Sequence, residues 1–219
     1  MIVRGELVMC LVPFAIISGY SSGLPAPSVI TTGRTAATGS RVAVVVDTSQ
    51  ATANSMNFLR SAVATLINGL PEGTEVLLAT TGRRLQVRVA PTVDRRKAAA
   101  SANAMTSDGG PTVLLDGLLE IDERFMRNVS GRNGVFVLVT GDGSESSKSE
   151  GTAFNSWLAT LSARSIVAHA VVLKTGNGVP EVVAKAIAGA TGGRCETIGS
   201  AALLQDKMEA IAAMVAQLR

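Results

Sequence analysis

Aromatic residues and cysteines are both scarce in this chain of 219 residues. Phe, Trp and Tyr make up 3% of it, against 47% for all hydrophobic residues, so Val, Ala, Leu and Ile must fill the core. The chain has two cysteines and one histidine. If the segment that carries Cys10 is removed, Cys195 is the only thiol left. Neither an intramolecular disulfide nor a zinc site built on cysteines can then form.

A contiguous basic patch is also missing from the sequence. The net charge is +3, and the basic residues are scattered. The densest groups are residues 94–97, at the start of an expected helix, and Arg83 with Arg84, in an expected hairpin turn. Binding to nucleic acids requires a basic surface and usually stacking aromatic rings. We therefore expect these residues to form a solvated face and the protein to have no nucleic-acid partner.

The first long apolar run, residues 7–17, has about the length of the apolar part of a signal peptide. It is too short to span a bilayer as a helix, and small residues suited to cleavage follow it. We expect residues 1–26 to be a signal peptide or membrane anchor, residues 27–40 a linker and residues 41–219 the folded domain. The protein would then be periplasmic or secreted. The alternative is that the apolar run is a short buried element of the domain.

Patterns typical of strands and helices alternate along the domain. The apolar runs 42–46 and 135–139 suit strands buried on both faces, whereas residues 85–89 alternate as in a half-exposed edge strand. We therefore predict an α/β fold with a doubly wound, mostly parallel sheet, one antiparallel edge strand and helices on both faces. The expected strands are 42–46, 75–80, 85–89, 135–139, 166–173 and 194–198, and the expected helices are 56–70, 93–105, 112–129, 152–163, 180–190 and 201–218.

Three polar loops are expected at one edge of this sheet. They comprise residues 47–51, 108–112 and 140–146, and two of them follow the most apolar strands. The carboxyl ends of the strands are where open α/β sheets usually hold ligands. Carboxylates beside hydroxyl groups suit a hard cation such as Mg2+.

These loops resemble those of a von Willebrand factor type A domain, and the resemblance covers about residues 41–218. Asp47 and Ser49 match the first two positions of that family's metal-binding motif, Asp-x-Ser-x-Ser. Thr112 corresponds to its loop threonine, and Asp142 to its late aspartate. The resemblance implies a Mg2+ site at these four residues, completed by a carboxylate from another protein. Further contacts to that partner are assigned to Gln50, Asp108, Ser144 and Glu145.

The sequence departs from the family's motifs at three positions. Ala51 stands where the second serine of the motif belongs, which removes one oxygen ligand. Pro111 is inserted before Thr112, and Gly141 is inserted before Asp142. We therefore expect Mg2+ to bind weakly or not at all.

Each candidate ligand also has a purely structural interpretation. Asp47 and Ser49 could accept hydrogen bonds from the amides of the following loop or helix. Thr112 could cap the next helix, and Asp142 could be a turn residue between two glycines. His169 lies within an apolar strand and is expected to be a structural residue of the sheet.

The function predicted from these patterns is that of an exported, non-enzymatic module that binds another protein. The alternative is an aspartate-dependent phosphoryl-transfer hydrolase of the haloacid dehalogenase type, with Asp47 as the nucleophile. That family places a second acid two residues later, where Ser49 stands here. Serine hydrolases and nucleotide-binding proteins are disfavoured because their Gly-x-Ser-x-Gly and glycine-rich phosphate-binding motifs are missing.

Overall fold

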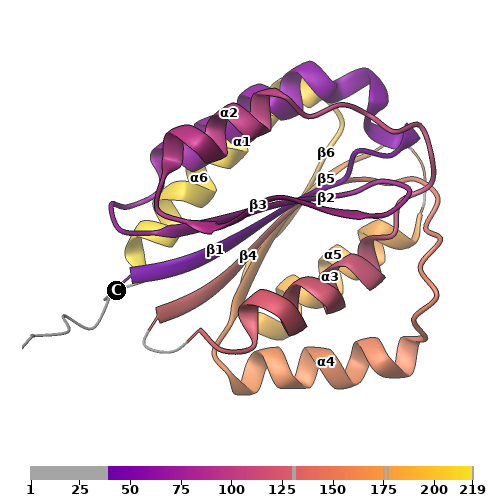
Figure 1. Cartoon of the computed structure of the whole chain (residues 1–219). Coiled ribbons are helices and arrows are strands. Elements are labelled where there is room, and N and C mark those ends of the chain that lie inside the picture. Colours follow the sequence, from indigo (N-terminus) through magenta and orange to yellow (C-terminus); the bar gives the residue numbers. More distant parts are fainter. Residues whose placement is uncertain (1–38, 130–131, 175, 177, 219) are drawn as a thin grey trace, which may run out of the picture. The chain divides into compact units, whose positions relative to one another are not determined.

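The computed structural model describes residues 39–129, 132–174, 176 and 178–218 (Figure 1). The predicted signal or anchor, residues 1–26, and nearly all of the predicted linker lie outside these residues. The first strand begins at Gly39, two residues before the expected domain boundary.

The centre of the fold is a six-stranded sheet with the strand order β3-β2-β1-β4-β5-β6. All neighbouring strands are parallel except β2 and β3, which form an antiparallel hairpin with β3 at the edge. This confirms the predicted α/β fold with one antiparallel edge strand. The strands are β1 (Gly39–Val46), β2 (Glu75–Thr81), β3 (Leu85–Thr92), β4 (Arg132–Gly141), β5 (Val167–Leu173) and β6 (Cys195–Ile198).

Helices cover both faces of the sheet. Figure 1 shows α1, α2 and α6 over one face and α3, α4 and α5 over the other. The helices are α1 (Met56–Gly69), α2 (Arg95–Asn103), α3 (Leu114–Ile121), α4 (Gly151–Ala163), α5 (Val179–Thr191) and α6 (Leu204–Gln217). Short 3-10 helices precede α1 (η1, Gln50–Ser55) and α6 (η3, Ala201–Leu203), and a π-helical turn (η2, Asp122–Met126) extends α3.

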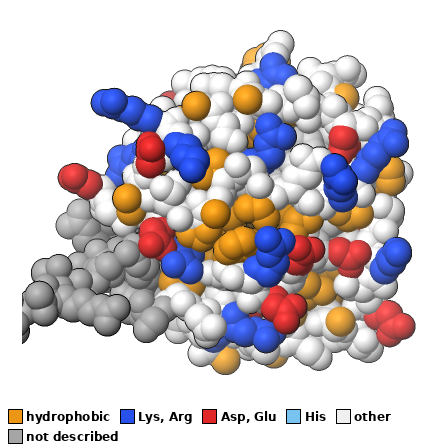
Figure 2. Space-filling view, in the orientation of Figure 1, with side chains coloured by type: hydrophobic (Ala, Val, Ile, Leu, Met, Phe, Trp, Pro, Cys, Tyr) orange, Lys and Arg blue, Asp and Glu red, His pale blue; other side chains and the backbone are white. Residues whose placement is uncertain are grey.

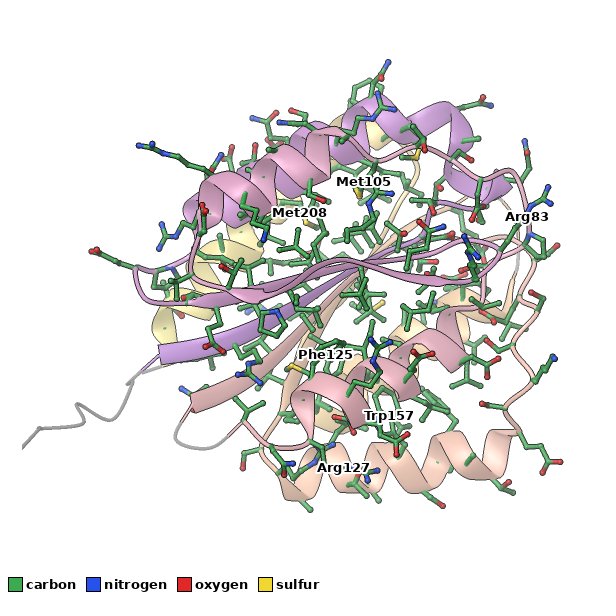
Figure 3. All side chains as sticks on the ribbon, in the orientation of Figure 1. Arg83, Met105, Phe125, Arg127, Trp157 and Met208 are labelled. Carbon is green, nitrogen blue, oxygen red and sulfur yellow. The ribbon has the colours of Figure 1, made fainter. Side chains whose placement is uncertain are left out.

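The continuous apolar run of β1 serves two hydrophobic cores. Val42, Val44 and Val46 pack into the core under α1, whereas Ala43 and Val45 pack into the core under α3 and α4. All five side chains are fully buried, because successive residues of a strand point to opposite faces. In Figure 3, Met105 and Met208 lie on the side of the sheet covered by α1, and Phe125 and Trp157 lie on the side covered by α3 and α4.

Charges are dispersed over the face of the molecule shown in Figure 2. Basic and acidic side chains alternate there around hydrophobic atoms near the middle of the view. Arg83, Arg84, Arg96 and Lys97 are exposed, as expected for residues of a solvated face. Over the part of the chain that the structure describes, none of the helices is long and apolar enough to cross a membrane.

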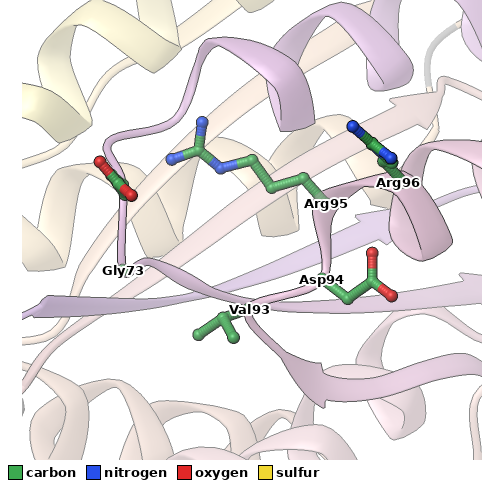
Figure 4. A pocket seen from close by; sticks show the side chains of 6 residues that line it. Gly73, Val93, Asp94, Arg95 and Arg96 are labelled. Carbon is green, nitrogen blue, oxygen red and sulfur yellow. The ribbon is translucent and has the colours of Figure 1, made fainter.

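A pocket of about 800 Å³ lies where β2 begins and β3 ends (Figure 4). Because β1 and β2 are parallel, the pocket lies at the amino-terminal end of these strands, opposite the end at which Asp47 follows β1. The pocket is lined by two acids, two arginines and two uncharged residues, namely Glu72, Gly73, Val93, Asp94, Arg95 and Arg96.

Candidate functional site

Asp47 lies directly after β1, and its side chain is fully buried. One carboxylate oxygen accepts a hydrogen bond from the Ser49 N–H at 2.8 Å. The other accepts from the Thr140 hydroxyl and the Gly141 N–H, both at 3.1 Å. Burial raises the pKa of Asp47, and these hydrogen bonds oppose that effect. Asp47 therefore joins the ends of β1 and β4.

Ser49 is the N-cap residue of the 3-10 helix η1, and its hydroxyl oxygen accepts a hydrogen bond from the Ala51 N–H at 3.3 Å. The methyl group of Ala51 lies close to the loop after β4. A Cβ atom at Gly141 or Gly143 would come within 2.8 or 2.5 Å of the Ala51 Cβ. Ala51 is thus tightly packed against two glycines.

Thr112 is also fully buried and connects two further segments. Its hydroxyl donates a hydrogen bond to the carbonyl oxygen of Thr81, at the end of β2. Its N–H donates to the Ser144 carbonyl at 2.9 Å, and the Ser146 N–H donates to its carbonyl at 2.8 Å. The Thr112 hydroxyl is therefore committed to β2 instead of capping α3, whose N-cap residue is Val113.

The three polar loops predicted from the sequence do meet, and we call them together the carboxyl-edge loops (residues 47–51, 108–112 and 140–146). Main-chain hydrogen bonds connect the first two. The Asp108 N–H donates to the Thr48 carbonyl at 3.0 Å, and the Gln50 N–H donates to the Gly110 carbonyl at 2.8 Å. The second and third loops are connected through Thr112, as described above. The edge is consequently held together by its own backbone.

Asp142 does not face Asp47 but the loop between β5 and α5. One of its oxygens lies 3.1 Å from Nζ of Lys174, and the other accepts a hydrogen bond from the Gly178 N–H. Gly141, which follows Thr140 directly, lies next to Asp47 and donates its N–H to that carboxylate. Asp142 is one residue further along, about 3.3 Å of extended chain beyond the residue that contacts Asp47.

The four predicted partner contacts differ in accessibility. The side chains of Gln50 and Ser144 are exposed. Asp108 is partly buried and accepts a hydrogen bond from the Arg83 N–H at 2.6 Å. Glu145 accepts from the N–H groups of Leu114 at 3.1 Å and Ser147 at 2.9 Å. Burial raises the pKa of Glu145, and the negative charge of Asp47 adds to this increase.

Two basic residues also lie at this edge: sequence reasoning placed Arg83 on a solvated hairpin turn, and it did not single out Lys174. Arg83 is exposed, and its Nε donates a hydrogen bond to the Asp108 carbonyl at 3.1 Å. Its side chain covers Gly110, because a Cβ there would lie 2.2 Å from the Arg83 Cγ. Figure 3 shows Arg83 at this end of the sheet. For Arg83 the usable signal was the predicted parallel sheet, which places the expected hairpin turn at the same end of the strands as Asp47, as the pairing of β1 with β2 shows.

The residues present do not fit a tightly bound divalent cation in this arrangement. Asp47 is the one carboxylate of the predicted ligand set that faces the centre of the carboxyl-edge loops, and both of its oxygens already accept hydrogen bonds. Asp142 is paired with Lys174 instead. Within the described part of the chain, no three His, Cys, Asp or Glu side chains are grouped to hold a metal ion. The ligand set Asp47, Ser49, Thr112 and Asp142 stays a prediction.

The histidine and the described cysteine have structural surroundings. Nδ1 of His169 accepts a hydrogen bond from the Arg194 N–H at 3.2 Å, and the side chain is buried in β5, as expected. Burial lowers the pKa of His169, and the positive charge of Arg194 lowers it further. Cys195 is partly buried against the core under α4, and burial raises its pKa. A thiol with a raised pKa is a poor nucleophile at neutral pH.

Comparison with known proteins gives matches to solved structures. No protein-family model and no curated protein matches the chain. A von Willebrand factor type A protein from Catenulispora acidiphila matches with a TM-score of 0.70 and 15% identity, over 82% of this chain and 43% of that one. An aerotolerance-related membrane protein from Bacteroides fragilis matches with a TM-score of 0.64 and 15% identity, over 82% of this chain and 100% of that one.

A third match is proximal thread matrix protein 1 from the mussel byssus, in a structure with a zinc-occupied MIDAS motif. It has a TM-score of 0.63 and 16% identity, over 81% of this chain and 46% of that one. The match thus spans less than half of the Catenulispora and mussel chains. At these identities the likeness concerns the fold, and it shows that a protein of similar fold can hold a metal ion.

Proposed function

We propose that this chain, whose fold is that of a von Willebrand factor type A domain, is an exported, non-enzymatic module that binds another protein through its carboxyl-edge loops. The observation that carries this proposal is the main-chain connection of three loops, which presents Gln50 and Ser144 on one ordered surface. A surface that is ordered before binding loses little conformational entropy when a partner docks.

The proposed partner contributes a carboxylate. Arg83 is exposed at the rim of the loops, with its backbone and Nε already fixed by Asp108. A guanidinium group held in one orientation suits a two-pronged contact to a carboxylate. This contact does not require a metal ion.

We also propose that any Mg2+ at Asp47, Ser49, Thr112 and Asp142 is held weakly. The support is the missing ligand at Ala51 and the pairing of Asp142 with Lys174. Ala51→Ser adds an oxygen and is expected to tighten Mg2+ binding, as measured by calorimetry.

Export is proposed from the apolar run at residues 7–17, which acts as a signal peptide or as a membrane anchor within residues 1–26. Cell fractionation and the mass of the mature chain test it. An intact chain recovered from the cytoplasm would contradict export.

The alternative of phosphoryl transfer is not favoured. The fold is that of von Willebrand factor type A domains, and Asp47 is fully buried with both carboxylate oxygens occupied by donors. A nucleophile must reach its substrate, whereas this carboxylate instead connects β1 to β4.

Site-specific crosslinking tests the docking surface. A photoreactive residue at position 144 of the full chain is expected to trap the partner, which is then purified for a binary binding measurement. Ser144→Arg should weaken that binding at least about tenfold, or about 1.4 kcal/mol. The matched control is Ser61→Arg, because Ser61 is an exposed serine of α1. Equal affinities for both variants would contradict the proposed surface.

A further inference from the structure

The ammonium group of Lys174 lies between two carboxylates next to the carboxyl-edge loops. Its Nζ is 3.1 Å from an Asp142 oxygen and 2.6 Å from a Glu181 oxygen. The Asp142 side chain is fully buried, the Glu181 side chain is 13% exposed and the Lys174 side chain is 38% exposed. One cation therefore serves two acids, one of which has no access to solvent.

The three residues come from three different elements. Asp142 follows β4, Lys174 follows β5 directly, and Glu181 belongs to the first turn of α5. The Gly178 N–H, at the positive end of α5, donates to the second oxygen of Asp142. The ion pairs thus connect the loop after β4 to the loop that leads into α5.

Hydrogen bonds within the cluster favour the charged forms of Lys174 and Glu181. Hydrogen bonds with Glu181 and Asp142 raise the pKa of Lys174. Hydrogen bonds from Lys174 and Lys185 lower the pKa of Glu181 to about 2.

Close packing of the two loops supports a fixed arrangement. A Cβ atom at Gly178 would lie 2.4 Å from the Gly143 carbonyl oxygen and 3.0 Å from an Asp142 carboxylate oxygen. At Gly176 it would lie 3.1 Å from the Asp142 carbonyl oxygen. Glycines at both positions let the backbone of one loop reach the backbone of the other.

We propose that Lys174 is a built-in counter-ion that replaces a divalent cation as the partner of Asp142 and fixes the loop after β4. The carboxyl-edge loops then keep their shape without bound metal. This inference rests on the proposed function only in taking the carboxyl-edge loops as a docking surface. Lys174, Asp142 and Glu181 are not among the residues proposed to contact the partner.

The consequence is a latent metal site. Without the ammonium group, the carboxylates of Asp142 and Glu181 face each other with no shared cation, and Asp142 is a buried charge that has lost its partner. Mn2+, which accepts carboxylate oxygens, would relieve this repulsion. The hydroxyl of Thr197, which lies 3.2 Å from Glu181, is a third oxygen nearby.

The test compares the full chain with Lys174→Met and Lys185→Met. Lys185 is the matched control, because its Nζ lies 2.7 Å from a Glu181 oxygen, whereas the described ion pair of Asp142 is with Lys174. In a chelator, Lys174→Met should have a lower Tm than Lys185→Met. Titration with Mn2+ should raise the Tm of Lys174→Met but not that of Lys185→Met. Lys174→Met should also bind Mn2+ at least about tenfold more tightly than the unmodified chain does, a difference in binding free energy of about 1.4 kcal/mol.

Two further variants complete the experiment. Lys174→Arg keeps the positive charge and should bind Mn2+ as weakly as the unmodified chain. Lys174→Met with Asp142→Asn should lose the gained affinity. If Lys174→Met is unfolded in chelator, Mn2+ must restore the fold.

The proposal is overturned if Lys174→Met gains no affinity for Mn2+, stays unfolded in its presence, or is no less stable than Lys185→Met. The partner affinity of Ser144→Arg is an independent readout. If Lys174→Met gains no affinity for Mn2+ while Ser144→Arg still weakens partner binding, the inference about Lys174 is wrong and the proposed function is unaffected.

Discussion

At the scale of single residues, Asp47 is a structural acid as well as a candidate ligand. Its three hydrogen bonds join the ends of β1 and β4 inside the fold. The sequence predicted its place at the end of a buried strand and the interpretation in which it accepts amide hydrogen bonds. Its connection to Thr140 and Gly141 could not be predicted, because they are more than ninety residues away along the chain.

Asp142 shows a second limit of prediction at this scale. The expected insertion of Gly141 predicted that the Asp142 carboxylate is displaced, but no pattern in the chain predicted where the carboxylate would point. The direction depends on Lys174 and Gly178, which approach only once β5 pairs with β4. Spacing within one loop predicts local conformation, whereas partners from another loop depend on the assembled sheet.

His169 leads to a prediction about pH. Its pKa lies below the ordinary 6.5 in the folded state, so the folded protein favours the neutral ring. The stability that this residue contributes is complete above pH 6.5 and is lost as the pH falls from there through the lowered pKa. Protonation also removes the acceptor for the Arg194 N–H. Urea unfolding should therefore show lower stability near pH 5 than at neutral pH.

The matched variant is His169→Asn, which retains an acceptor for Arg194 but does not titrate. Its stability should depend less on pH over the same range, with all other ionisable groups unchanged. An identical pH dependence for both proteins would show that His169 does not contribute.

At the scale of elements, the predicted order of strands and helices agrees with the structure. The predicted helix 112–129 is the instructive exception, because α3 starts at Leu114 and passes into a π-helical turn at Asp122. Residues 112 and 113 are not helical, because Thr112 forms hydrogen bonds with β2 and with the loop after β4. Helical periodicity predicts the buried face of an element, whereas its ends depend on such tertiary contacts.

Two helical glycines should respond oppositely to substitution by alanine. In α5, a Cβ atom at Gly189 meets nothing within 4 Å, so Gly189→Ala should stabilise the protein by about 0.4–1 kcal/mol. In α3, a Cβ atom at Gly117 would lie 2.7 Å from the Thr81 side chain, so Gly117→Ala should destabilise it by about 1–3 kcal/mol. Urea unfolding of both variants measures the difference. Two stabilised variants would contradict the close packing of α3 on β2.

At the scale of the whole molecule, the parallel sheet determines where the docking surface forms. Because β1, β2, β4 and β5 run in the same direction, the segments that follow them meet at one edge. The opposite edge carries the pocket beside Glu72 and Arg95, whose lining is mixed in charge. The fold thus separates the ordered carboxyl-edge loops from the other end of the sheet.

The central claim is that the chain itself, without a bound cation, holds the carboxyl-edge loops in place. The most direct measurement is amide hydrogen exchange of the full chain in a chelator and in excess Mg2+. The N–H groups whose hydrogen bonds join these loops should be protected from exchange equally in both conditions. These N–H groups belong to Gln50, Asp108, Thr112 and Ser146. Rapid exchange of these amides in chelator, with protection appearing on addition of Mg2+, would contradict the account.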